Sequence, residues 1–420
     1  MMHFYADDRT RKLLLSPQPK VYLYGGFEGF DNYGDVIQLK GAIEFHQRTT
    51  GRTPIAILSL AAWTESGLLD RLAATYGIEG FVFEDANWLD ASDVGLAPVE
   101  AVQAGALLHI YGGGYFNTHW GARRAFVCEQ IIFGLHIGQY VVSGVQVDAI
   151  GVSHLVRLFD LKVPLIVGGR DELSVRLLSD VLPMQRVRYS FDDAVEFIEA
   201  LNEKLVLHGG SDGSADRTVG FHMNLTSEYI GSDQRDVATA IVRAVVQRYD
   251  SHGATLLHAY NDRRRIVRDT LQSINEIGLS ALFPMFNVVD FASLSVRSEL
   301  DTGTLRTLLL AIDRIDFVIT ASYHIALTMN LLGKPTFLLA ENEYYRDKRA
   351  ALGLADDIDA FLAQPRRFLR DFADERRQRR DWIEELTRTI EATEWWSEEA
   401  RVPAPMEAPA ERVSSRYFGR

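Results

Sequence analysis

Glycines and side chains that bind ligands or transfer protons first occur together in residues 25–35, which read Gly-Gly-Phe-Glu-Gly-Phe-Asp-Asn-Tyr-Gly-Asp and follow a short apolar run. Gly26 and Gly34 would let the backbone approach a ligand, and a helix that begins near Asn32 and Asp35 would offer N–H groups to an anion. The spacing departs from the dinucleotide-binding fingerprint. Contact with a ligand and simple helix capping by Asn32 or Asp35 are therefore equally supported.

Three consecutive glycines, Gly112, Gly113 and Gly114, follow the apolar run 106–111 and precede Asn117. Ligands of parallel sheets gather outside the carboxyl ends of the strands, and glycines there leave only bare backbone on the wall of a cleft. A tight turn from strand to helix needs one glycine rather than three. The triple glycine therefore favours a ligand-binding wall.

Cationic and proton-transferring side chains follow two further predicted strands. Arg170 lies in Gly-Gly-Arg-Asp-Glu-Leu-Ser, and its planar guanidinium matches carboxylate or phosphate geometry, although a surface arginine paired with an acid has the same pattern. His324 lies where a strand gives way to a helix, and an imidazole there can exchange a proton near neutral pH. Arg346 and Lys348 could supply positive charge to an anionic substrate, but alone they would be taken for solvent-facing charges.

Apolar runs that alternate with helical patterns place these segments in an α/β protein with parallel sheets covered on both faces. A stretch rich in Gly, Ser and Asp separates two such series. We therefore predict two Rossmann-like doubly wound domains that face each other across a cleft, the GT-B layout, and a C-terminal amphipathic helix. Predicted strands cover residues 21–24, 55–60, 80–83, 106–111, 139–142, 164–167, 218–222, 254–259, 317–320 and 335–339, and predicted helices cover 36–48, 67–76, 123–133, 174–182, 233–249, 263–277 and 304–314.

The predicted domain organisation follows from these patterns. An N-terminal extension (1–17) precedes an N-terminal Rossmann-like domain (18–205), a linker (206–217), a C-terminal Rossmann-like domain (218–365), a helix (366–400) and a frayed tail (401–420). Two domains suit a chain of 420 residues, which is too long for one ordinary hydrophobic core.

Composition narrows the classes of partner. The net charge of −13 opposes broad attraction to nucleic acid or anionic lipid. A single cysteine, Cys128, rules out an intrachain disulfide and a cysteine-built metal site. The histidines are scattered and lack paired carboxylates at ligand spacing, so we expect no metal and no cofactor. The sequence also shows no signal-peptide core and no apolar span of about 20 residues. We expect a soluble cytoplasmic protein, with a homo-oligomer left open.

The order of these motifs resembles the polysaccharide pyruvyl transferase family. The resemblance rests on Asn-x-Gly-Asp at 32–35, the triple glycine, Arg-Asp-x-x-Ser at 170–174, and Ser-x-His followed by Gly-x-Pro at 322–335 and then Lys348. It implies transfer of the enolpyruvyl unit of phosphoenolpyruvate onto sugar hydroxyls as a ketal, with phosphoenolpyruvate as donor substrate and a glycan or glycoside as acceptor. The first domain would bind the acceptor through its glycine segments, Asn32 and Asn117.

The resemblance also implies roles for individual side chains. Arg170 and Lys348 would hold the carboxylate and phosphate of the donor with help from Arg346, and His324 would act in acid–base transfer. From the opposite domain, Asp35 could take the hydroxyl proton. One position departs from the family, because Ser322 stands where an arginine is usual two residues before the histidine. This change weakens the expected anion site.

Three further interpretations remain. The same fold could belong to a glycosyltransferase that uses a nucleotide sugar, for which a divalent-cation requirement would speak. The chain could also be a divergent family member with another acceptor, or a protein that binds a ligand without turnover. The acceptor itself cannot be inferred from the residues.

Overall fold

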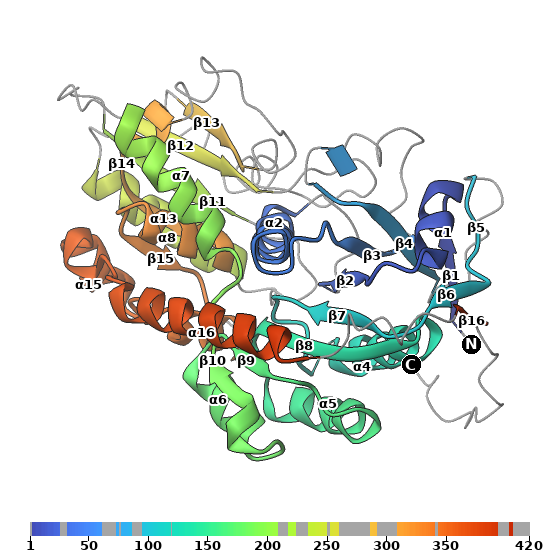
Figure 1. The fold of residues 1–420 in the computed structure, drawn as a ribbon. Helices are drawn as coiled ribbons and strands as arrows, with labels where there is room; N and C mark the ends of the chain where they lie inside the picture. Colours follow the sequence, from blue (N-terminus) through green and yellow to red (C-terminus); the bar gives the residue numbers. More distant parts are fainter. Residues whose placement is uncertain are drawn as a thin grey trace.

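The protein is described by a computed structural model, which places residues 2–25, 32–60, 73–74, 77–85, 95–118, 120–208, 217–223, 234–249, 253–259, 286–291, 309–340, 343–393 and 403–405. Two mainly parallel sheets organise these residues (Figure 1). Gly26 and most of the predicted helices 67–76 and 263–277 lie outside the described residues.

The first sheet has nine strands in the order β10-β9-β8-β7-β2-β3-β4-β1-β5. All neighbours are parallel except β1, which is antiparallel to both β4 and β5. The central strands are buried along their whole length, as expected of a parallel sheet with both faces covered. The bounds are β1 His3–Ala6, β2 Val21–Tyr24, β3 Ile55–Ser59, β4 Gly80–Asp85, β5 Ala97–Pro98, β7 Ala106–Ile110, β8 Ile137–Val145, β9 Val167–Gly169 and β10 Val187–Tyr189.

Different helices cover the two faces of this sheet. One face packs against α4 (Gly121–Gly134), α5 (Ala149–Leu161) and α6 (Glu172–Ser179), together with α1 (Asp8–Leu15). The other face packs against α2 (Tyr33–Thr49) and against α16 (Ala373–Glu391), which comes from the far end of the chain. Trp382, Leu386 and Ile390 of α16 are buried there at intervals of four residues, as expected of an amphipathic helix.

The second sheet has five parallel strands in the order β13-β12-β11-β14-β15. The bounds are β11 Thr218–His222, β12 Gly253–His258, β13 Phe286–Asp290, β14 Ile315–Thr320 and β15 Thr336–Leu338. One face packs against α8 (Gln234–Arg248) and α15 (Ile358–Ala363). The other packs against α7 (Val195–His208) and α13 (Tyr323–Leu331), and α14 (Glu343–Ala351) follows β15.

Helix α2 belongs to both halves of the molecule. Its residues Val36, Leu39 and Ile43 pack on the first sheet, whereas Tyr33 and Ile37 belong to the core of the second. Figure 1 accordingly shows α2, in blue, between the strands of the two sheets. The site described below forms around the first turns of this helix.

The prediction of an α/β fold with two parallel Rossmann-like sheets and a C-terminal amphipathic helix is confirmed. Helices α5 and α7 and strand β10 were not predicted, and the predicted strand 164–167 overlaps β9 only at Val167. Residues 1–17, expected to stand apart, contribute β1 and α1 to the first half, and β16 (Pro403–Pro405) pairs with β6 (Ala101–Gln103) within the expected tail. Helix α7 continues to residue 208, past the predicted start of the linker. Turns of 3-10 helix occur at Met184–Arg186 and Pro365–Phe368.

Among the helices that the structure describes, none combines the length and the apolar character needed to span a bilayer.

Candidate functional site

The strand order of each sheet reverses at one point, and both reversals lie beside predicted site residues. In the first sheet the chain runs outward from β2 in one direction and from β7 in the other. In the second sheet the reversal lies between β11 and β14. Ligands of open α/β sheets bind outside the carboxyl ends of the strands at such points. Gly25 and the triple glycine follow β2 and β7, and Ser322 and His324 follow β14.

Tyr33 of α2 fastens the first sheet to the second. Its hydroxyl lies 3.2 Å from Thr328 Oγ1, its ring centroid lies 4.9 Å from that of Phe291, and its N–H donates to the carbonyl of Ala259 at 2.9 Å. Because all three partners belong to the second half of the chain, the amino end of α2 is fixed against that half.

Gly34 lies directly against His324. A Cβ built on Gly34 would fall 2.0 Å from His324 Nδ1, so only glycine leaves room for the imidazole at this place. Asn32 caps the same helix, since its side chain accepts the Gly34 N–H at 3.0 Å. The next residue, Asp35, is partly buried beside the histidine. The amino end of α2 therefore brings a carboxyl group and an imidazole together from opposite halves of the chain.

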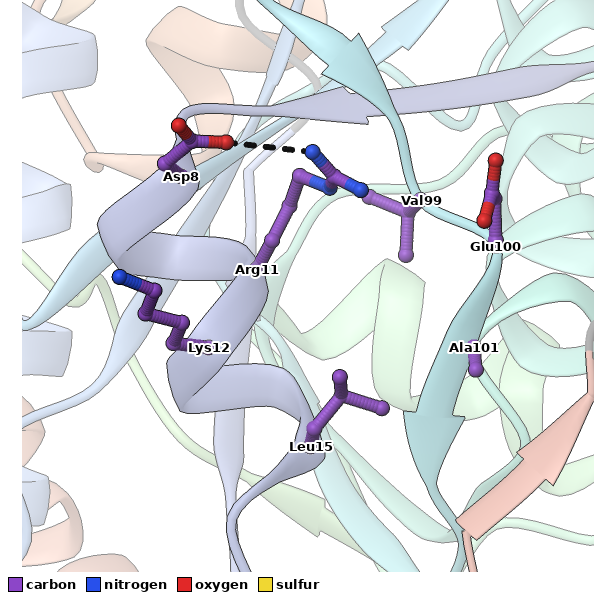
Figure 2. A pocket seen from close by; sticks show the side chains of 7 residues that line it. All are labelled: Asp8, Arg11, Lys12, Leu15, Val99, Glu100 and Ala101. Atoms are coloured by element: carbon purple, nitrogen blue, oxygen red, sulfur yellow. Dashed lines mark hydrogen bonds and ion pairs between the residues drawn. The ribbon is translucent and has the colours of Figure 1, made fainter.

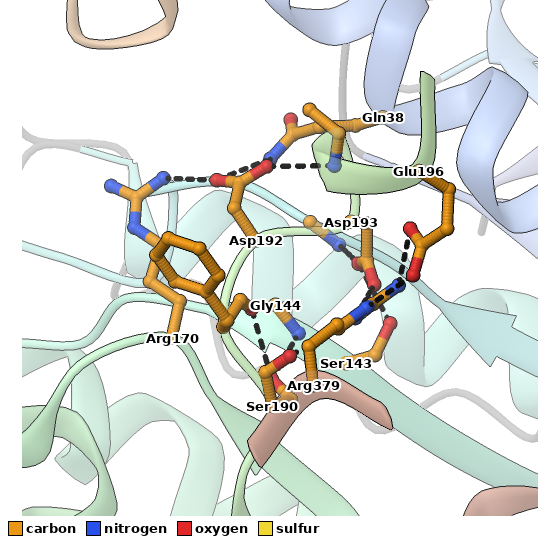
Figure 3. A network of polar contacts seen from close by, with 12 residues as sticks. Gln38, Ser143, Gly144, Arg170, Ser190, Asp192, Asp193, Glu196 and Arg379 are labelled. Atoms are coloured by element: carbon orange, nitrogen blue, oxygen red, sulfur yellow. Dashed lines mark hydrogen bonds and ion pairs between the residues drawn. The ribbon is translucent and has the colours of Figure 1, made fainter. Parts of the chain in front are cut away.

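Asp192 is a fully buried carboxylate at the centre of the site, and sequence analysis did not identify it. It accepts hydrogen bonds from Gln38 Nε2 at 3.1 and 3.2 Å and lies 3.4 Å from the guanidinium of Arg170 (Figure 3). His324 Nε2 lies 3.7 Å from the same carboxylate. Arg170 also donates to the side-chain oxygen of Gln146. The Asp192 carboxylate therefore lies between the guanidinium of Arg170 and the imidazole of His324.

The ring of Tyr323 supports the other side of this group. The guanidinium carbon of Arg170 lies 4.0 Å from the ring centroid of Tyr323, close enough for a cation–π interaction. Stacking and the Asp192 pair together fix the plane of the guanidinium. Arg170 is thus buried and oriented rather than a surface arginine.

Burial and charge shift the titration of three neighbouring groups. Burial alone would raise the pKa of Asp192, but the interactions with His324 and Arg170 hold it well below its usual range. Burial raises the pKa of Asp35, although the charges of His324 and Lys348 oppose that shift. Burial, followed by the charge of Arg170, lowers the pKa of Lys348 well below that of a free lysine. Asp35 is therefore able to hold a proton, and Lys348 is able to lose one, nearer to neutral pH than usual.

The adjacent residue, Asp193, forms a second and separate network. Its carboxylate accepts the Gly112 N–H and the Ser143 hydroxyl, each at 2.7 Å, and pairs with Arg379 of α16 at 2.8 Å (Figure 3). Arg379 also binds Glu196 at 2.8 Å. Gly112 has a φ of +54°, a left-handed conformation that favours glycine. Asp193 thus fixes the glycine loop after β7 to the C-terminal helix.

Two buried histidines extend this network into the interior of the first domain. Ser143 donates to Asp193, so its oxygen accepts from His109 Nε2–H at 2.7 Å, and His109 Nδ1 must then accept from His46 Nε2–H at 2.9 Å. Burial lowers the pKa of His109 to about 3 and that of His46 well below its ordinary value. Both imidazoles are therefore neutral, and each has one defined tautomer.

The sequence-predicted residues divide into two groups. Gly34, Asp35, Arg170, His324 and Lys348 lie together in the electrostatic cluster around Asp192. The others do not share that cluster in the described contacts. Ser322 caps α13 by accepting the Ile325 N–H at 3.4 Å, and Asn117 forms hydrogen bonds within its own loop. Arg346 is exposed, and Gly113 and Gly114 continue the glycine loop. Gly26 is not among the described residues.

Sequence analysis missed Gln38, Asp192, Asp193 and Arg379. A usable signal was present for two of them, because the paired acids 192–193 follow a short run of strand-forming residues and so lie at the carboxyl end of a strand. Within the part of the chain that the structure describes, no three His, Cys, Asp or Glu side chains are close enough together to hold a metal ion.

A separate cavity of 230 Å³ lies between α1 and the strands β5 and β6 (Figure 2). Arg11 and Asp8 form an ion pair of 3.2 Å at its edge, and both are side chains of the surface helix. The volume is below the roughly 300–1,000 Å³ typical of small-molecule pockets. None of the cluster around Asp192 lines this cavity, so it is not the candidate site.

Comparison with known proteins gives similar folds only. No family model and no curated protein sequence matches the chain. Among solved structures, UDP-GlcNAc 2-epimerase from Neisseria meningitidis bound to UDP-GlcNAc is similar with a TM-score of 0.46 and 13% identity, over 91% of this chain and 94% of that one. The Methanocaldococcus jannaschii UDP-GlcNAc 2-epimerase in complex with UDP-GlcNAc and UDP has a TM-score of 0.45 and 12% identity, over 88% and 99%. S. aureus MnaA in a co-structure with UDP has a TM-score of 0.43 and 10% identity, over 91% of each chain.

The predicted resemblance to polysaccharide pyruvyl transferases is wrong. No family model matches the chain, that of the pyruvyl transferases included. The predicted transfer of an enolpyruvyl unit from phosphoenolpyruvate is therefore also wrong. The structure gives a physical reason, because the polar residues of three motifs, Asn32, Asp171 and Ser322, are the N-caps of α2, α6 and α13. Short strand-to-helix turns of this kind recur in doubly wound sheets for local reasons.

Proposed function

We propose that this chain is an enzyme that binds a sugar nucleotide where α2 meets the second sheet, and that His324 and Asp35 transfer protons on the bound sugar. One observation carries the proposal: two cations, Arg170 and Lys348, share a largely buried cluster with an imidazole and a carboxyl group, beside the reversal points of both sheets. Such a combination is typical of functional sites rather than of structural cores.

The charges of the cluster favour an anionic ligand. Asp192 pairs with Arg170, and although Asp35 and Asp192 also favour the charged form of Lys348, burial and the charge of Arg170 outweigh them. A phosphate or diphosphate beside Lys348 would restore that charge, because an opposite charge at this range stabilises the ammonium. The lowered pKa of Lys348 is therefore the shift expected of a lysine in an anion-binding site without its ligand.

The imidazole of His324 and the carboxyl group of Asp35 suit proton transfer at a sugar. His324 retains 14% of its side-chain exposure, so a ligand can reach it, and its Nε2 lies 3.7 Å from the Asp192 carboxylate. The raised pKa of Asp35 lets that carboxyl group hold a proton at a higher pH than an ordinary aspartic acid does. An acid and a base in different environments, on opposite sides of one site, can serve either epimerisation or transfer of a sugar.

The test begins with binding. We expect isothermal titration calorimetry with a panel of UDP-, GDP- and dTDP-linked sugars to find at least one ligand, with UDP-GlcNAc as the first probe because it is the ligand in two of the similar structures. Arg170→Met should abolish this binding, whereas Arg157→Met, at an exposed arginine, should leave it unchanged. A wild-type protein that binds none of the panel would refute the proposal.

Turnover separates an enzyme from a silent binding protein. Incubation of the bound sugar nucleotide with the protein, alone and with sugar acceptors, should yield an epimer or a transferred sugar detectable by NMR or mass spectrometry. His324→Ala should retain binding through Arg170 and lose product formation. Equal product formation by wild type and His324→Ala would remove His324 from the mechanism, and binding without any product would exclude the enzyme.

A further inference from the structure

Tyr111 carries a buried hydroxyl that the protein itself does not use. The residue directly follows β7 and is only 2% exposed. Its hydroxyl oxygen is buried and has no hydrogen-bond partner among the described residues. A phenylalanine would make the same packing contacts without the cost of desolvating a hydroxyl.

Burial without a partner is not sufficient to define a site, because Tyr22 shares it. The hydroxyl of Tyr22 is also buried and unpaired, yet that ring belongs to the core on the face covered by α4 and α5. The position of Tyr111 is different. Its ring lies on the other face of the sheet, the face covered by α2, at the reversal point between β2 and β7.

The surroundings of the Tyr111 hydroxyl point toward a ligand. A Cβ on Gly25 would lie 2.5 Å from this oxygen, so a glycine at the end of β2 is what leaves the hydroxyl room. Asp35 lies in the first turn of α2, the helix that packs on this same face, and its charge raises the pKa of Tyr111 further, after the larger effect of burial. Tyr111 is therefore a neutral phenol, able to donate a hydrogen bond, on the face of the sheet where α2 also carries a carboxyl group.

We propose that the Tyr111 hydroxyl and the Asp35 carboxylate together bind one hydroxyl group of the substrate sugar. A sugar hydroxyl is both donor and acceptor, so it can accept from Tyr111 while it donates to Asp35. This pairing satisfies the buried phenol and orients the sugar hydroxyl toward the group that removes or returns its proton. The inference rests on the proposed function, since it names the part of the sugar nucleotide that this side of the site recognises.

Tyr111→Phe tests the proposal because its two expected effects have opposite signs. Removing a buried, unpaired hydroxyl should leave the ligand-free protein at least as stable, with a Tm unchanged or higher by about 2 °C. The same change should weaken binding of the tightest sugar nucleotide of the panel by roughly 2- to 10-fold, the usual range for one neutral hydrogen bond. Binding of the matching free nucleoside diphosphate should not change, because it lacks the sugar.

Tyr22→Phe is the matched control. It removes an equally buried hydroxyl from the same sheet, so its Tm should behave in the same way, but its affinity for both ligands should equal that of the wild type. The proposal is overturned if Tyr111→Phe binds the sugar nucleotide as tightly as the wild type does, or if it loses affinity for the free nucleotide to the same extent. Failure of the proposed function has a different signature, because the wild type itself would then bind no sugar nucleotide.

Discussion

Substitution of Gly34 by alanine should displace His324 without harming the fold. The added methyl group would lie 2.0 Å from His324 Nδ1 and 2.5 Å from Cγ, whereas ordinary contacts of a Cβ begin at 3.4 Å. The imidazole must therefore retreat by about 1.4 Å. It can do so because the ring is the end of a side chain that retains 14% exposure, so the shift can be taken up toward solvent.

The expected consequence is a stable protein with little activity. Alanine is a better helix former than glycine, so α2 should not lose stability, and Tm should stay within about 2 °C of the wild type. A misplacement of about 1 Å in a catalytic group can cost roughly 100-fold in rate, which corresponds to about 2.7 kcal/mol in the activation free energy. We therefore expect kcat/KM for the sugar nucleotide to fall about 100-fold in Gly34→Ala.

A double-mutant cycle identifies the cause of that loss. Once His324 is alanine, the methyl group at position 34 no longer has a ring to displace, so Gly34→Ala should add little to the defect of His324→Ala. Calorimetric unfolding and steady-state kinetics of the two single variants and the double variant complete the experiment. Activity of Gly34→Ala within threefold of the wild type, or full additivity in the cycle, would refute the reasoning.

Three further predictions concern the buried charges. Arg379→Met should lower the free energy of unfolding by about 3–5 kcal/mol in denaturant, because it leaves the buried Asp193 carboxylate without its cation. The control Arg380→Met, on the exposed face of α16, should cost less than about 0.5 kcal/mol, and equal effects of the two variants would contradict a stabilising role of the Arg379–Asp193 pair. Burial and a neighbouring cation lower the pKa of Lys348, and a bound anion should raise it, so ligand binding should take up a proton and weaken as pH rises. Calorimetric titrations in buffers of different ionisation enthalpy should detect this proton uptake in the wild type and not in Lys348→Met. The pKa of His109 is lowered to about 3 from 6.5, so between these pH values the unfolded chain binds a proton that the folded protein does not, and the free energy of unfolding should fall by up to about 1.4 kcal/mol per unit of decreasing pH. Denaturant unfolding between pH 5.5 and 4 should show a correspondingly shallower slope for His109→Asn than for the wild type.

The sequence was most informative where the cause of a structure is local. The strand at 218–222 was predicted to the residue, because a short apolar run ends at clear boundaries. Helix α5 was missed although its signal was present: Asp148 caps it, and Val152, Leu155 and Phe159 are buried at three- and four-residue spacing. The cap and the spacing of apolar residues in α5 are both local, so this helix could have been predicted from the sequence.

The site was less predictable because its partners are far apart in the chain. Asp192 binds Gln38 across 154 residues, and Asp193 binds Arg379 across 186. No spacing rule links such positions, and only the sheet order brings them together. Arg170 and His324 were found because each follows a strand, which is a local property. Their common carboxylate, Asp192, could be recognised only from the assembled fold.

The position of α16 has a consequence for how the protein matures. The helix that closes one face of the amino-terminal sheet, through Trp382, Leu386 and Ile390, is made by the ribosome only after both sheets have been synthesised. A nascent chain that lacks it would present an uncovered apolar surface, and the glycine loop would lack its cation at position 379. Such an intermediate is a natural client for chaperones. Loss of this single late helix, by premature termination or proteolysis, would therefore damage the half of the molecule most distant from it in translation.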